Sequence, residues 1–193
     1  MSFKKSTFKN IYQIGGFSYV GQVLTFLSSV VLARLLLPEE YGFVAMIMVI
    51  TNFASILTGI GIGSDIIRSS FGYTYHKSMM NLALYMGIIL CLIIMAAAYP
   101  LSRFFGNSEL IIPTLFIATQ FILSGVNMVH YSLLVKRQKF TLVGIITLFC
   151  TILTITIMIG MAYFGFSYWS LIVPLVIVEW IKAFIFTRYT KIG

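Results

Sequence analysis

The chain has 193 residues, of which 60% are hydrophobic and only 9% are charged. Soluble domains contain about 25% charged residues, so this composition excludes a water-soluble globule and indicates an integral membrane protein. The formal net charge is +8. Because the basic residues cluster between apolar blocks, they are expected to orient the protein and contact anionic lipid headgroups rather than nucleic acid.

Charged residues, prolines and glycines divide the chain into six apolar spans. Each is close to the roughly 20 helical residues that cross a bilayer. The spans are expected at residues 11–35, 41–61, 79–99, 110–134, 140–164 and 167–187. The predicted fold is therefore all-α, a polytopic bundle of six transmembrane helices that forms one domain over residues 1–193.

The connecting segments predict how the bundle is oriented. Most basic side chains outside the spans fall on one side of the membrane: Lys4, Lys5, Lys9, Arg68, Lys77, Lys136, Arg137, Lys139, Arg188 and Lys191. The other side has Arg103 and, at its border, Arg34. Because cytoplasmic loops carry the excess of Lys and Arg, both termini are predicted to be cytoplasmic.

The segment LARLLLPEEYG, residues 32–42, places three charges between the first two spans. Pro38 suits the first position of a helix, and Glu39 and Glu40 would then lie at the positive N-terminal end of the second span. Arg34 complements the negative C-terminal end of the first span. This structural explanation needs no substrate. The alternative is that the charges belong to transport machinery.

Polar residues inside three spans follow helical spacing. The stripes are Ser18, Gln22, Thr25 and Ser29 in the first span, Thr51, Ser55 and Thr58 in the second, and Gln120, Ser124, Asn127 and Tyr131 in the fourth. Polar groups facing lipid are costly, so these faces are expected to point into the bundle. Two interpretations remain open: hydrogen bonding between packed helices, or a polar wall around a water-filled cavity.

Charged residues in or near the spans are candidates for gating or ion coupling. Glu179 and Lys182 lie three residues apart on one face of the sixth span, where they either neutralise each other or serve a function. Asp65 and Arg68 have the same spacing at the end of the second span and form either a local ion pair or an inner gate. His130 is expected to be a packing residue at a helix interface.

The sequence contains no pattern typical of catalysis or metal binding. No serine, histidine and acid form a recognisable set, no paired carboxylates lie in a loop, and Cys91 and Cys150 lie inside apolar runs. We therefore expect no enzyme activity, metal or cofactor. A membrane-embedded glycosyl- or acyltransferase remains an alternative, for which Glu179 is the best candidate residue.

Four segments resemble, in order, the N-terminal half of the bacterial Wzx-type polysaccharide exporters, which flip lipid-linked oligosaccharides. VVLARLLLPEEYGFVAM is similar to the family's motif between helices one and two, and SRFFGNSELI to the segment before helix four. YSLLVKRQKF is similar to the loop between helices four and five, and FGFSYWSLIVP to the start of helix six. Together these segments are distributed over most of the chain, from residue 30 to residue 174.

The resemblance implies a multidrug/oligosaccharidyl-lipid/polysaccharide exporter fold. In this fold, two six-helix lobes enclose a central cationic cavity and alternate between inward-open and outward-open forms. It implies translocation of an undecaprenyl-pyrophosphate-linked repeat unit across the bacterial inner membrane, for lipopolysaccharide O-antigen, capsule or exopolysaccharide synthesis. Basic side chains suit a pyrophosphate, since charge-assisted contacts to phosphate are strong.

The resemblance also suggests binding residues. Arg34 matches the arginine of the first motif, and Arg68 is a candidate at the cavity mouth. With the polar stripes, the predicted substrate-binding set is Arg34, Arg68, Gln22, Thr25, Gln120 and Asn127. The expected partners are the lipid-linked oligosaccharide, membrane lipids, a second lobe or second copy of the chain, and a polysaccharide polymerase.

One departure from the family pattern concerns size. Family members have about twelve or more helices, whereas this chain is expected to form six and therefore matches one N-terminal lobe. Alternating access requires two lobes that move against each other, so a C-terminal lobe is expected to be missing from this chain. The alternative function is that of a non-transporting membrane subunit, or an inactive fragment, in a polysaccharide-synthesis complex.

Overall fold

The computed structural model describes residues 2–59 and 73–190, with side chains described for 15–56 and 78–190. The helices are α1 (Ser2–Leu35), α2 (Pro38–Gly59), α4 (Tyr73–Phe104), the 3-10 turn η1 (Ser108–Leu110), α5 (Ile111–Ala118), α6 (Gln120–Lys136), α7 (Phe140–Tyr163) and α8 (Trp169–Thr190). The described ranges contain no β-strand, so the predicted all-α membrane bundle is confirmed.

Five of the predicted spans are confirmed by length and composition. The stretches long and apolar enough to cross a membrane are Gly15–Leu35, Ser78–Phe104, Ser108–Lys136, Phe140–Tyr163 and Trp169–Thr190. The protein is therefore a multi-pass membrane protein. The helix α2 is not among the five stretches, and its first turn carries Glu39 and Glu40.

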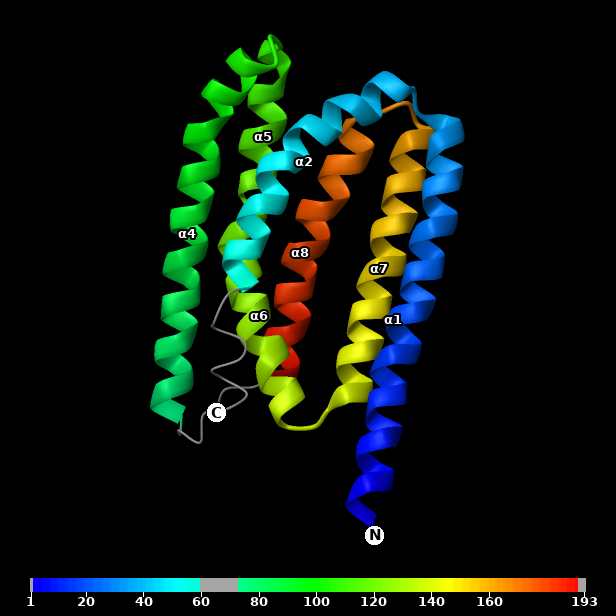
Figure 1. Ribbon diagram of the computed structural model, residues 1–193, viewed down its shortest axis with the longest axis vertical. Coiled ribbons are helices and arrows are strands. Elements are labelled where there is room, and N and C mark those ends of the chain that lie inside the picture. Colours follow the sequence, from blue (N-terminus) through cyan, green and yellow to red (C-terminus); the bar gives the residue numbers. More distant parts are fainter. Residues whose placement is uncertain (1, 60–72, 191–193) are drawn as a thin grey trace.

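The bundle is arranged around α8. Figure 1 shows α1 lying along α7 and α4 lying along the α5–α6 pair, and both α6 and α7 contact α8. The helix α2 crosses obliquely and contacts α4, α5 and α6. The beginning of α1 and the end of α8 lie at the same end of the bundle (Figure 1). This agrees with termini on one side, and the cytoplasmic identity of that side stays a prediction.

The predicted fourth span, 110–134, lies within one membrane-spanning stretch, Ser108–Lys136. Thr119, between α5 and α6, is a one-residue irregularity whose backbone stays in the right-handed helical region (φ −64°, ψ −24°). The Thr119 hydroxyl donates to the carbonyl of Phe116 at 2.7 Å, and its N–H bonds the same carbonyl at 3.2 Å. A threonine side chain that binds a nearby carbonyl competes with the helical ladder, which is consistent with the local irregularity at Thr119.

Two glycines let α4 and α6 approach closely. A methyl group added at Gly87 would lie 2.4 Å from the carbonyl oxygen of Phe121, and one added at Gly125 would lie 2.6 Å from that of Ala83. Small residues at such crossings allow helix backbones to pack in direct contact. The α4–α6 contact therefore forms a tightly packed side of the bundle.

The charged segment between α1 and α2 has a structural role. Helix α2 begins at Pro38, as predicted, and the carboxylate of Glu40 accepts from the backbone N–H of Leu37 at 2.8 Å. Such a bond satisfies an N–H group at the start of the helix. The hydroxyl of Ser167 also donates to the Glu40 carboxylate. Glu40 therefore connects the start of α2 to the turn between α7 and α8.

Candidate functional site: a polar trough

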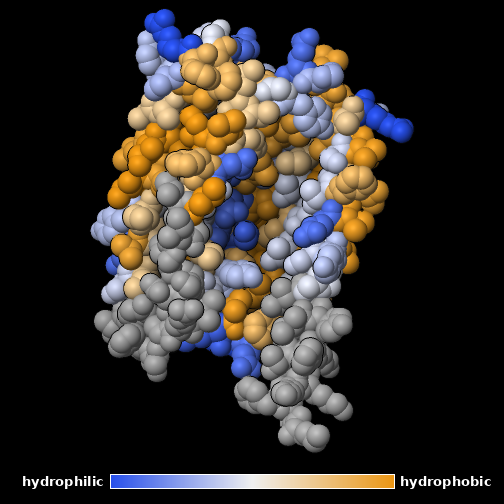
Figure 2. Space-filling model, viewed as in Figure 1, coloured by the Kyte–Doolittle hydropathy of each residue, from blue (hydrophilic) through white to orange (hydrophobic). Residues whose placement is uncertain are grey.

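Three connected pockets form an open groove, called here the polar trough. They have volumes of about 370, 340 and 210 Å³. Tyr131 is shared by the first and third pockets, and Ser124 and Glu179 by the second and third. Figure 2 shows hydrophilic side chains gathered in a hollow between hydrophobic ridges. The polar lining comprises Ser18, Gln22, Thr25, Thr51, Asn52, Ser55, Gln120, Ser124, Asn127, Tyr131, Thr147, Thr151, Glu179 and Lys182.

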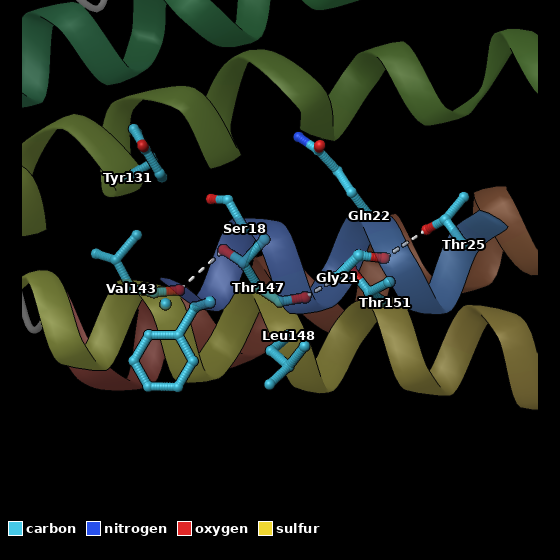
Figure 3. Close-up of a pocket in the computed structure, with 11 residues that line it drawn as sticks. Ser18, Gly21, Gln22, Thr25, Tyr131, Val143, Thr147, Leu148 and Thr151 are labelled. Carbon is cyan, nitrogen blue, oxygen red and sulfur yellow. Dashed lines mark hydrogen bonds between the residues drawn. The ribbon is translucent and has the colours of Figure 1, made fainter. Parts of the chain in front are cut away.

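One side of the trough lies between α1 and α7. Figure 3 shows Gln22 extending from α1 toward α6, while Tyr131 of α6 lies across from Ser18. Thr147 and Thr151 reach the same pocket from α7. Each of these threonines bonds a carbonyl of its own helix, at 2.8 Å and 3.0 Å respectively. The polar part of this pocket's lining therefore consists of hydroxyl and amide groups, beside the apolar side chains of Phe17, Val143 and Leu148.

The other side of the trough contains a charged group anchored between α6 and α8. The Asn127 Nδ2 atom donates to Glu179 Oε1 at 2.7 Å and to the Glu179 backbone oxygen at 3.1 Å. The second carboxylate oxygen lies 3.5 Å from Lys182 Nζ. Because charge-assisted hydrogen bonds between nitrogen and carboxylate are about 2.7–2.9 Å long, the amide holds Glu179 more closely than the lysine does.

Residues of all three polar stripes line the trough, although Ser29 of the first stripe does not. Gln22, Thr25, Gln120 and Asn127 all line the trough, and so do Glu179 and Lys182. The predicted roles of these six residues in binding, gating or ion coupling stay predictions. Asp65 and Arg68 lie outside the described residues, as does the side chain of Thr58.

Arg34 is not brought together with the other predicted binding residues. It lies near the end of α1, in a separate groove of about 510 Å³ with Leu27, Val30, Val31 and Leu35. The described lining of the trough therefore contains one lysine and one glutamate as its charged side chains. The substrate-binding role expected for Arg34 stays a prediction.

The sequence interpretation missed the contribution of α7. Thr147 and Thr151 line the trough, and with Thr154 they are spaced by four and three residues, the same rhythm as the other stripes. This signal was available in the sequence. Threonines in a strongly apolar helix are equally compatible with ordinary packing, so their spacing alone did not indicate a groove.

His130 is a packing residue, as expected. It is 2% exposed, and its ring nitrogens contact the hydroxyls of Thr190 at 2.5 Å and Thr187 at 3.5 Å. Arg137 donates to the carbonyl of Thr190 at 3.0 Å. These contacts fasten the end of α8 to α6. Among the described residues, no three His, Cys, Asp or Glu side chains are grouped to hold a metal ion.

Comparison with known proteins shows which family the chain resembles. A family model described as polysaccharide biosynthesis protein matches residues 31–192. The chain is 31% identical over 159 residues to the succinoglycan biosynthesis transport protein ExoT of Rhizobium meliloti (strain 1021). That match covers 79% of this chain and 31% of the relative, so the chain spans about a third of the relative's length. No solved structure matches the chain.

Proposed function

The chain belongs to the polysaccharide biosynthesis protein family, and we propose that it acts in polysaccharide export as one lobe of a membrane transporter. The cargo is an undecaprenyl-pyrophosphate-linked oligosaccharide repeat unit, which crosses the bacterial inner membrane by alternating access. The product is lipopolysaccharide O-antigen, capsule or exopolysaccharide. The similarity to a succinoglycan biosynthesis transport protein supports the exopolysaccharide branch of this proposal.

The polar trough carries the proposal. Its lining comes from α1, α2, α6, α7 and α8, so five helices place their polar groups along one open groove. Ionisable and amide groups at membrane depth are costly and are usually retained for transport or assembly. An open groove about as large as a small-molecule site supports passage of a polar cargo better than helix packing alone.

The open side of the trough is proposed to face a second lobe. Alternating access requires two bundles that rock around a shared site, and the described helices form one bundle. The second lobe is supplied by a longer polypeptide or by another copy of the chain. Gln22, Thr25, Gln120 and Asn127 contact the cargo in this scheme, and Glu179 with Lys182 responds to its passage. Arg34 and Arg68 are retained as contacts for the pyrophosphate.

The experiment that tests this function removes the gene from its native host. Surface polysaccharide and the lipid-linked intermediates of the inner membrane are both measured. A transport defect lowers surface polysaccharide while the completed lipid-linked unit accumulates on the cytoplasmic side. Complementation with Gln120→Leu is expected to restore little export, whereas Asn81→Leu is the matched control, since Asn81 is an exposed amide on α4 outside the trough.

Other outcomes distinguish the alternatives. If the lipid-linked unit is not made at all, the chain acts in synthesis, and Glu179→Gln becomes the test of a transferase. If export fails only because a partner such as a polysaccharide polymerase no longer co-purifies, the chain is an assembly subunit. Unchanged surface polysaccharide after deletion would contradict the proposed function.

A further inference from the structure

Four hydroxyl groups along the trough present hydrogen-bond acceptors rather than donors. A hydroxyl has one proton to donate and two lone pairs that accept. Four trough hydroxyls already donate that proton to a carbonyl of their own helix, at 2.8–3.0 Å: Thr25, Ser124, Thr147 and Thr151. Figure 3 shows three of these bonds. The oxygen atoms of these residues therefore offer lone pairs to a ligand in the trough.

The amide of Asn127 adds a further acceptor. Its nitrogen is engaged by Glu179, whereas its Oδ1 atom is buried and lacks a hydrogen-bond partner within the described residues. The residue is only 3% exposed. Leaving a buried acceptor unpaired is unfavourable, so this oxygen would gain from a ligand that donates a hydrogen bond. The neighbouring carboxylate of Glu179 is also an acceptor when ionised.

Charge narrows the choice of ligand. Lys182 lies 3.5 Å from Glu179 and offsets its charge, and the other described trough residues are uncharged at neutral pH. A cationic ligand attracted by the Glu179 carboxylate would be repelled by the neighbouring ammonium group of Lys182. A phosphate group offers acceptor oxygens only, so it could not donate a hydrogen bond to the four engaged hydroxyls or to the Asn127 Oδ1 atom. A neutral compound with many hydroxyl groups avoids both conflicts.

We infer that the trough binds the uncharged, hydroxyl-rich sugar part of its cargo by accepting hydrogen bonds from sugar hydroxyls, in preference to phosphate. This inference rests on the proposed function, because it names the part of the cargo that this lobe contacts. Gln22 and Gln120 supply amide donors that complete the pattern, since a sugar hydroxyl both donates and accepts. Thr147 and Thr151 are specificity-determining residues in this scheme.

The test measures ligand binding to the purified full chain in lipid nanodiscs by saturation-transfer NMR. The probes are maltotetraose, as a neutral oligosaccharide, and inorganic pyrophosphate. We expect maltotetraose to bind and pyrophosphate to bind more weakly. Because a hydrogen bond contributes on the order of 1 kcal/mol, or about fivefold in affinity, Thr147→Val and Thr151→Val should each weaken maltotetraose binding about fivefold.

The matched control is Thr156→Val. Thr156 is also on α7 and donates to the carbonyl of Ile152 at 2.8 Å, but it does not line the trough. Its replacement should leave the affinity unchanged, which separates loss of an acceptor from a general effect on the helix. All three positions are at least partly accessible, so folding should tolerate the isosteric change.

Three results would overturn the inference: no maltotetraose binding, preferential binding of pyrophosphate, or equal affinities in the trough variants and the control. Each of these results is a binding measurement on the purified chain and is independent of the export assay in cells. If deletion of the gene blocks export but maltotetraose does not bind, the inference fails and the function stands. If maltotetraose binds but deletion leaves export unchanged, the proposed function fails.

Discussion

Asn127 and Glu179 lie 52 positions apart in the chain and join α6 to α8 in the middle of the trough. The asparagine amide donates to the glutamate carboxylate at 2.7 Å and to its backbone oxygen at 3.1 Å. One side chain thus fixes both the position of the charged group and the spacing of the two helices. The same two hydrogen bonds therefore hold α6 against α8 and fix the position of a charged group in the groove.

Replacing Asn127 by leucine should destabilise the protein, because the partly buried carboxylate of Glu179 loses its closest donor. We expect the free energy of unfolding to fall by about 1–2 kcal/mol, as for a hydrogen bond to a charged group inside a membrane protein. Denaturant-induced unfolding in lipid bicelles measures the change. Asn81→Leu should have little effect, and equal stabilities of the two variants would contradict the role given to Asn127.

The α4–α6 crossing should not tolerate a methyl group. Gly87→Ala and Gly125→Ala would each place a Cβ atom less than 3 Å from a backbone oxygen of the facing helix. Overpacking of this kind costs roughly 1–3 kcal/mol, and thermal unfolding of the purified variants would show it as a lower Tm.

Gly160→Ala is the control for this prediction. Gly160 lies in α7 with open space around the added methyl group. Because alanine favours helix over glycine by about 1 kcal/mol, this variant should be as stable as the parent or more so. A Tm loss as large as that of Gly87→Ala would show that close packing is not the cause.

Two adjacent glutamates should differ in their effect on stability. Glu40→Ala removes the acceptor for the Leu37 N–H and for the Ser167 hydroxyl, so it should cost about 1 kcal/mol, as for loss of a helix cap. Glu39 is exposed, and Glu39→Ala should change stability by a few tenths of that amount. Urea titration of both variants compares them, and identical midpoints would refute the structural role of Glu40.

The end of α8 should become more dynamic when its contact with His130 is removed. Thr190→Val eliminates the hydroxyl 2.5 Å from the imidazole, while the bond from Arg137 to the backbone carbonyl can remain. Hydrogen exchange followed by mass spectrometry should show faster exchange in the last turns of α8. The contact of Thr187 with the same ring is 3.5 Å long, so Thr187→Val should have a smaller effect.

Helical spacing was enough to predict the polar stripes of α1 and α6, because residues three or four positions apart share one face of a helix. It also placed Glu179 beside Lys182, which form an ion pair in the structure. It could not pair Asn127 with Glu179, since nothing in a single sequence tells which helices are neighbours. The irregularity at Thr119 was not predicted, because the apolar pattern continues through it and the span itself is unbroken.

The sequence by itself determined that this is a membrane bundle, which faces are polar and, apart from the start of α1, where its helices begin and end to within about six residues. Those properties follow from local composition and from the cost of exposing polar groups to lipid. The tertiary structure decided which polar faces meet, and it placed Arg34 in a separate groove with Leu27, Val30, Val31 and Leu35. It also brought together Thr25, Thr147 and Thr151, whose hydroxyl protons are engaged by helix carbonyls, so that these three residues offer acceptors to a ligand in the groove.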